Sequence, residues 1–117
     1  MTSKEKGNIG LGRAIAFATT NNMIVSIPLN DAQDYDIIFD NGSLLKVQVK
    51  YITNNIVDKR VRGHKDANGN YYIKDNVEEP DYYFITVANV GDYFIPSDYV
   101  KDKQTFTIND NYNQYKI

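Results

Sequence analysis

The chain contains no cysteine and a single histidine, His64. The absence of cysteine excludes disulfides, thiolate metal sites and cysteine nucleophiles, and a single histidine excludes a metal site built from histidines alone. Any metal must therefore be bound by carboxylate, amide or backbone carbonyl oxygens, which are the ligands of hard cations such as Mg²⁺. The lack of cysteine also fits a reducing, cytoplasmic compartment.

Long apolar runs and an excess of positive charge are missing as well. No apolar stretch approaches about 18 residues, so the sequence predicts no membrane span, and residues 1–6 are not followed by the apolar segment of a secretory signal. With 13 Lys and Arg against 15 Asp and Glu, the formal net charge is −2. This balance argues against a generally basic coat for nucleic acid, so any such contact requires a local basic groove.

What is present is the composition of one globular domain. The 117 residues are 42% hydrophobic and 24% charged, which excludes an intrinsically disordered chain. We expect a single domain over residues 1–117, with a core at about residues 6–100 and a loose polar C-terminal tail.

One amphipathic helix is predicted over about residues 8–22. Leu11, Ala14, Ile15 and Ala18 recur at helical spacing and form one apolar stripe, and two asparagines then supply a C-terminal stop. Three glycines crowd the start of this helix. Because no strand precedes them and no Lys-Ser/Thr pair follows, they indicate close packing rather than a phosphate-binding loop.

Short apolar runs bounded by turn residues predict the strands. The expected strands are residues 23–27, 35–39, 44–51, 71–73, 82–87, 93–95 and 105–108, the first starting in the middle of the sheet and the last at its edge. Residues 53–70 are expected to be a polar connection, and residues 97–100 a helical turn. The predicted fold is α+β, with the N-terminal helix packed on a mixed, mainly antiparallel sheet.

The strand at residues 44–51 alternates strictly between apolar and polar side chains, and a half-solvated strand would explain that pattern by itself. The preceding strand adds information. If the turn is the three residues 41–43, Asp36 lies directly opposite Gln48, and Lys50 lies two residues further along the same face. A two-residue turn would instead place Asp36 opposite Val47.

An Asp, an amide oxygen and a Lys at one sheet edge suit phosphodiester hydrolysis. The carboxylate and the amide can hold a divalent cation, which polarises the phosphate and acidifies a water molecule. The Lys can orient that water or stabilise the charge of the transition state.

The same residues carry a family resemblance. The Tyr-Asp pair at 35–36 and the Val-Gln-Val-Lys-Tyr segment at 47–51 resemble the core of PD-(D/E)xK nucleases, nearest to the branch of group I intron-associated endonucleases and Holliday-junction-resolvase-like proteins. Matching segments occur in the same order over about residues 4–100, at 6–10, 25–28, 81–84 and 93–96.

The resemblance implies a restriction-endonuclease-like core and an endonuclease that uses Mg²⁺ or Mn²⁺ on DNA, as a homodimer or higher oligomer. It implies that Asp36 is a metal ligand, that Gln48 is a metal ligand or positions the metal, and that Lys50 stabilises charge and orients water.

One position departs from the family pattern. An acid is expected in the first helix just after the second glycine of the motif, and this sequence has Leu11 there. The alternative function is therefore a catalytically degenerate nuclease fold that binds nucleic acid or a protein partner, such as a phage or mobile-element inhibitor. A stand-alone interaction domain unrelated to nucleases is the other alternative.

The main basic cluster is residues 59–65. It is a solvated loop in one interpretation. In the other it contacts DNA phosphates through Arg60, Arg62 and Lys65, with Lys6 as a further contact. His64 is expected to be exposed or bound to the backbone. Most of the ten tyrosines alternate along strands, which favours packing over base stacking.

Overall fold

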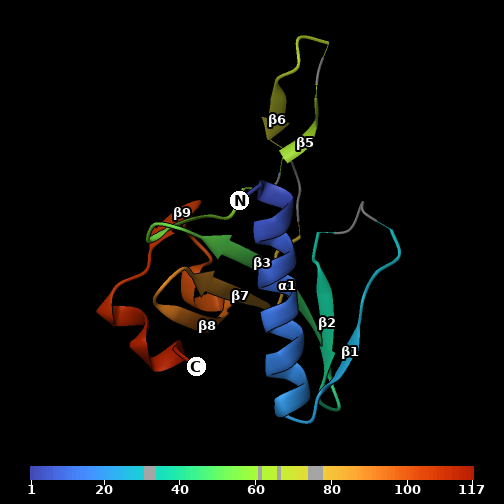
Figure 1. Cartoon of the computed structure of the whole chain (residues 1–117), viewed down its shortest axis with the longest axis vertical. Coiled ribbons are helices and arrows are strands. Elements are labelled where there is room, and N and C mark those ends of the chain that lie inside the picture. Colours follow the sequence, from blue (N-terminus) through green and yellow to red (C-terminus); the bar gives the residue numbers. More distant parts are fainter. Residues whose placement is uncertain (31–33, 61, 66, 74–77) are drawn as a thin grey trace.

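The computed structural model describes residues 1–30, 34–60, 62–65, 67–73 and 78–117. Its centre is a five-stranded sheet of order β1–β2–β3–β7–β8, with helix α1 (Ser3–Thr20) lying across it (Figure 1). The sheet strands are β1 (Ile24–Ser26), β2 (Ile37–Asp40), β3 (Leu44–Ile52), β7 (Tyr82–Val87) and β8 (Gly91–Pro96).

Two smaller sheets and two 3₁₀-helices complete the described elements. One small sheet pairs β4 (Ile56–Asp58) with β9 (Thr105–Thr107), and the other pairs β5 (Arg62–Lys65) with β6 (Tyr71–Ile73). The 3₁₀-helices are η1 (Ser97–Val100) and η2 (Asp110–Tyr115). No described helix has both the length and the apolar content that a membrane crossing requires.

The sheet is mixed and mainly antiparallel, so the predicted α+β class is confirmed. Only β3 and β7 among its neighbouring strands run parallel, and the long connection between them provides the crossover that a parallel pair needs. Asp81 fixes the start of β7 on β3. Its N–H donates to the Lys46 carbonyl and its carboxylate accepts from the Lys46 N–H, both at 2.8 Å.

Helix α1 begins at Ser3, five residues earlier than predicted. The reason is a capping box: the Thr2 hydroxyl accepts from the Glu5 N–H at 3.1 Å, and the Glu5 carboxylate accepts from the Thr2 N–H at 3.5 Å. The helix ends at Thr20 with Asn21 as its C-cap, so the predicted asparagine stop is confirmed. Close packing is confirmed for Gly10, because a Cβ there would lie 3.2 Å from Val49 Cγ1 on β3.

The two faces of the sheet bury separate cores. On the α1 face, Ala14 and Ala18 pack with inward residues of β2, β3 and β7, namely Ile37, Phe39, Val47 and Phe84. On the opposite face, β7 and β8 pack against β4, β9 and the 3₁₀-helices, through Val57, Tyr83, Ile85, Val87, Tyr93, Ile95, Val100, Phe106, Ile108 and Tyr112. Along β7, consecutive side chains therefore belong to different cores, with Phe84 in one and Tyr83 and Ile85 in the other.

Several sequence expectations are wrong in detail. The first strand, β1, is at the sheet edge and not in the middle, and Ile24 is exposed. The stretch 53–70 is not all connection, because β4 and β5 lie in it. The C-terminal tail is not loose, since η2 places Tyr112 in the core and the Ile117 N–H donates to the Asp92 carbonyl at 2.9 Å.

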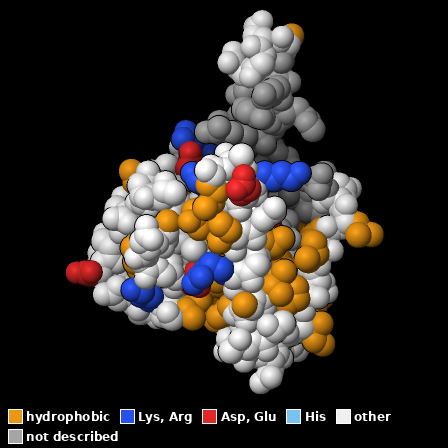
Figure 2. Space-filling model, in the orientation of Figure 1, with side chains coloured by type: hydrophobic (Ala, Val, Ile, Leu, Met, Phe, Trp, Pro, Cys, Tyr) orange, Lys and Arg blue, Asp and Glu red, His pale blue; other side chains and the backbone are white. Residues whose placement is uncertain are grey.

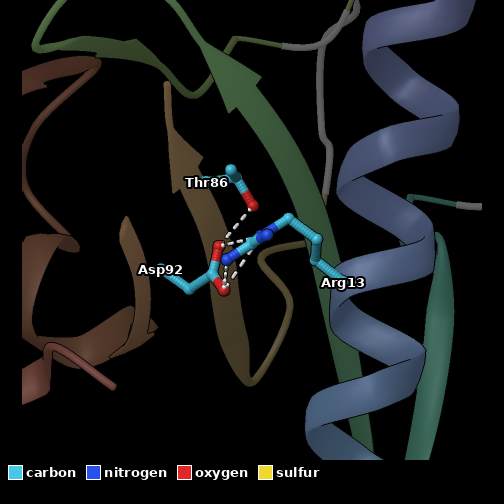
Figure 3. A network of polar contacts seen from close by, with 3 residues as sticks. All are labelled: Arg13, Thr86 and Asp92. Carbon is cyan, nitrogen blue, oxygen red and sulfur yellow. Dashed lines mark hydrogen bonds and ion pairs between the residues drawn. The ribbon is translucent and has the colours of Figure 1, made fainter. Parts of the chain in front are cut away.

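An ion pair joins α1 to β8, the strand at the edge of the sheet opposite β1 (Figure 3). Arg13 on α1 binds both carboxylate oxygens of Asp92 on β8, through Nε at 2.8 and 3.0 Å and Nη2 at 2.7 Å. Thr86, the partner of Asp92 across the β7–β8 ladder, donates its hydroxyl to the same carboxylate at 2.7 Å. Apolar side chains flank α1 on both sides in the space-filling view (Figure 2).

Candidate active site

The β2–β3 turn sets which residues meet across the hairpin. The pairing ends at Asp40 opposite Leu44, which leaves the three residues 41–43 as the turn. Gly42 has a φ of +104°, and its N–H donates to the Asp40 carboxylate at 2.9 Å. The predicted three-residue turn is therefore confirmed. The paired register ends with Ile37 opposite Val47, and the Asp36 N–H donates to the Val47 carbonyl, so the ladder is irregular at Asp36 and its predicted pairing with Gln48 stays a prediction.

The pleat places Gln48 and Lys50 on one face of β3. Ile37 and Val47 are paired and both belong to the core under α1. Because neighbouring side chains alternate along a strand, Gln48 and Lys50 lie on the opposite face of the sheet. Asp36 lies just before β2, and its carboxylate is close enough to Lys50 for each charge to affect the pKa of the other. That all three side chains share one face stays a prediction.

Asp36 hydrogen-bonds to β3 through both its backbone and its side chain, at the point where the β2–β3 pairing ends. Its N–H donates to the Val47 carbonyl at 2.9 Å, and its Oδ2 accepts from the Val49 N–H at 2.8 Å. The carboxylate thus takes the place of a backbone carbonyl at the end of the strand. One oxygen is held in a fixed direction, and the other can bind a ligand.

The electrostatics of Asp36 and Lys50 are coupled. Removal of water by the surrounding protein raises the pKa of Asp36, although the Val49 N–H and the charge of Lys50 act to lower it. Burial likewise lowers the pKa of Lys50, against the opposite effect of Asp36 and Asp58. The buried neighbour of Lys50 on β7 is Ile85, which accounts for the loss of water.

Asp58 is a charged neighbour of Lys50 that the sequence did not indicate. It ends β4, a strand that was expected to be loop. Arg60, two residues along the chain, donates two side-chain hydrogen bonds to the Asp58 carboxylate: Nε lies 2.9 Å from Oδ1, and Nη2 lies 2.7 Å from Oδ2. These hydrogen bonds hold the pKa of Asp58 at about 2. The sequence signal was the short Ile-Val-Asp run at residues 56–58.

The predicted DNA-contacting residues belong to three different parts of the fold. Arg60 is bound to Asp58 beside Lys50. Arg62 and Lys65 lie on β5, outside the main sheet, and Lys6 lies on α1, which covers the other face. Lys59 lies in the same basic segment, but it is buried and bound to Glu79 Oε1 and the Val100 carbonyl, both at 2.6 Å.

Leu11 lies where the family pattern expects an acid. Its side chain is half-buried and packs against the core under α1, on the side of the sheet away from Lys50. Within the described part of the chain, no group of three or more His, Cys, Asp or Glu residues is placed to hold a metal ion. An oxygen site here would consist of the Asp36 carboxylate and the Gln48 amide, with waters and substrate oxygens completing it. This donor set fits Mg²⁺, which commonly uses one or two carboxylates and keeps several waters.

Comparisons with known proteins found a matching family model and a similar solved structure. A family model described as PD-(D/E)XK endonuclease matches residues 1–114. Among solved structures, the bacterial homing endonuclease I-Ssp6803I has a similar fold, with a TM-score of 0.73 and 23% sequence identity. That match covers 94% of this chain and 80% of the other. No curated protein matches significantly.

Proposed function

Because the chain belongs to the PD-(D/E)XK endonuclease family, we propose that it hydrolyses phosphodiester bonds in DNA with a divalent metal ion, Mg²⁺ or Mn²⁺. The observation that supports this most directly is the anchored carboxylate of Asp36, which lies beside Lys50 at the end of the β2–β3 hairpin.

Each residue has a separate role in this proposal. Asp36 and Gln48 hold the cation, which when bound supplies a Lewis acid for the phosphate and a water molecule of lowered pKa. The Val49 N–H keeps the Asp36 carboxylate oriented. Lys50, beside Asp36, donates to a phosphate oxygen and stabilises the negative charge that develops there.

The first experiment measures cleavage of plasmid and duplex DNA across a Mg²⁺ and Mn²⁺ titration. Asp36→Asn and Lys50→Ala should each lose at least about a hundredfold in rate, as expected for removing a group that stabilises the transition state. Lys101→Ala, which removes an exposed lysine after η1, is the matched control and should cleave normally. Equal rates in all four proteins would place the active site elsewhere.

Leu11 supports a second candidate, a nuclease fold that binds DNA or a protein partner without cleaving. The position supplies no carboxylate, and its side chain is used in packing. Leu11→Glu should raise cleavage at low Mg²⁺ if the site lacks only that ligand. Leu11→Gln, similar in shape but uncharged, is the control for the packing change. Retained DNA binding with no cleavage by wild type or Leu11→Glu would favour the second candidate.

Arg60, Arg62, Lys65 and Lys6 are proposed to contact the DNA. A side chain that neutralises a phosphate releases counterions, so the slope of log affinity against log salt should become shallower by about 0.9 for each phosphate that is no longer neutralised. Arg60→Ala with Arg62→Ala should therefore flatten the slope by about 1 to 2, measured by fluorescence anisotropy. An unchanged slope would move the DNA surface away from this segment.

Two copies are proposed to act together, because cutting both strands of a duplex is easiest with two sites. Light scattering after gel filtration, with and without duplex DNA, tests for the homodimer or higher oligomer. A monomer under both conditions, with full double-strand cleavage, would contradict this part of the proposal.

A further inference from the structure

The β5–β6 ribbon is the element that the proposed active site leaves unexplained. Its two strands pair with each other, Arg62 opposite Ile73 and Lys65 opposite Tyr71, and they join no other described strand. Figure 1 shows the ribbon standing out beyond the N-terminal end of α1, away from the five-stranded sheet. An isolated two-stranded ribbon has little core of its own, so its position indicates a partner.

The charge of this part of the chain is opposite to that of the whole. Residues 59–65 contain four of the 13 Lys and Arg residues and no acid, in a chain of net charge −2. Lys59 and Arg60 are engaged with Glu79 and Asp58 at the base. Figure 2 shows Lys or Arg side chains around this base, next to Asp or Glu. Over residues 62–73 the ribbon carries Arg62, Lys65 and one acid, Asp66, which gives it a formal net charge of +1.

The ribbon also begins close to the proposed active site. β4 ends at Asp58, whose charge acts on Lys50, and β5 starts four residues later. A duplex whose phosphate lies at Lys50 would therefore pass close to the base of the ribbon. The major groove is about 12 Å wide and admits a two-stranded β-ribbon, whereas the minor groove, at about 6 Å, would have to be widened by deforming the duplex.

We propose that the β5–β6 ribbon enters the major groove of duplex DNA and sets the position of the duplex at the Asp36–Lys50 face. The inference rests on the proposed function, since it names the groove and the element through which that site receives its substrate. The residue types on β5 suit the partner, because Arg and Lys are the side chains that most often read guanine edges in the major groove.

The test compares two duplexes of one sequence, one with ordinary cytosine and one with glucosylated 5-hydroxymethylcytosine, whose sugars fill the major groove. Binding of the full chain is measured by anisotropy in EDTA, so that no cleavage occurs. Wild type should bind the glucosylated duplex at least about tenfold more weakly, the effect expected when one or more major-groove contacts are blocked.

Two variants locate the effect. Replacement of residues 62–73 by a short Gly-Ser linker, and separately Arg62→Ala with Lys65→Ala, should weaken binding to ordinary DNA and remove the discrimination between the duplexes. Lys101→Ala with Lys103→Ala is the charge-matched control and should behave as wild type. Circular dichroism checks that each variant is folded, and the double substitution keeps the test valid if the linker variant does not fold.

The outcomes separate the two proposals. Equal wild-type binding to both duplexes, or full discrimination by the variants, would overturn the ribbon proposal while leaving hydrolysis intact. Ribbon-dependent binding with no cleavage in Mg²⁺ or Mn²⁺ would support the ribbon and contradict hydrolysis. Absence of any DNA binding by wild type would overturn both.

Discussion

At the scale of single residues, Asp36 is held by one hydrogen bond in a place that disfavours its charge. For an acid whose pKa is raised by folding, the charged form destabilises the folded state, and the effect grows as the pH rises above the ordinary value of 3.8. Functional sites commonly contain charged groups that lower the stability of the folded protein.

Asp36→Asn should therefore raise the melting temperature at pH 7 without divalent metal, because the amide oxygen can still accept from the Val49 N–H. The gain should disappear below pH 3.8, where the carboxylate is protonated in the folded and unfolded chains alike. Thermal melts from pH 3 to 8 measure this. Asp102→Asn, an exposed acid after η1, is the control, and an equal gain in it would refute the explanation.

The effect of Asp58 on the stability of the fold depends on pH in the opposite direction. Hydrogen bonds from Arg60 lower its pKa to about 2, so its contribution to stability is present above pH 3.8 and is lost as the pH falls toward 2. Arg60→Gln should bring the pKa of Asp58 back toward its ordinary value, as measured by NMR titration of the side-chain carboxyl carbon. The pKa should also rise when Arg60 turns from Asp58 to a DNA phosphate.

At the scale of elements, the contact between α1 and β3 depends on one glycine. Gly10 is buried, with Val49 Cγ1 at 3.2 Å and Tyr51 Cβ at 3.6 Å from an added Cβ, whereas Gly12 has nothing within 4 Å. A larger side chain at Gly10 would push the helix from the strand that carries Gln48 and Lys50.

The two glycines give two substitutions whose expected effects on stability have opposite signs. Gly12→Ala should stabilise the protein by about 0.5 to 1 kcal/mol through helix propensity alone. Gly10→Val should destabilise it by about 1 to 3 kcal/mol, the usual cost of overpacking. Urea unfolding measures both. A stabilised Gly10→Val would show that α1 can move away from β3 at little cost.

At the scale of the whole molecule, the C-terminal segment completes the core on the side of Lys50. Tyr112 on η2 is 3% exposed, its ring lies 5.5 Å from that of Phe106 on β9, and β9 pairs with the strand that ends in Asp58. The tail therefore supports the position of β4 and is part of the fold.

Tyr112→Ala should cost about 3 kcal/mol, as for other large aromatic side chains removed from a core. Tyr115→Ala, at a half-buried ring beside the same core, should cost less. Chemical unfolding of both variants gives the comparison. A cost below about 0.5 kcal/mol for Tyr112→Ala would mean that the segment contributes little to folding.

The sequence by itself determined the features that depend on residues close together in the chain. Strict alternation over residues 44–51 and a three-residue turn with glycine were enough to set the register of β2 on β3 and the face of Gln48 and Lys50, because a hairpin's register follows from its turn. The helical stripe predicted the face of α1 that is buried. The start of α1 was missed, although its cause, a capping box at Thr2 and Glu5, is also local.

Only the tertiary structure decided which distant segments meet. The parallel pairing of β3 with β7, the approach of Asp58 to Lys50 and the packing of Tyr112 each join residues that are far apart in the chain or belong to short elements with weak patterns. Three-residue strands such as β4 and β9 are stable because of what they pack against, so their own residues do not specify them. For the same reason the sequence named the basic segment at residues 59–65, and the fold alone brought Asp58 beside Lys50 and placed Arg62 and Lys65 on a separate ribbon.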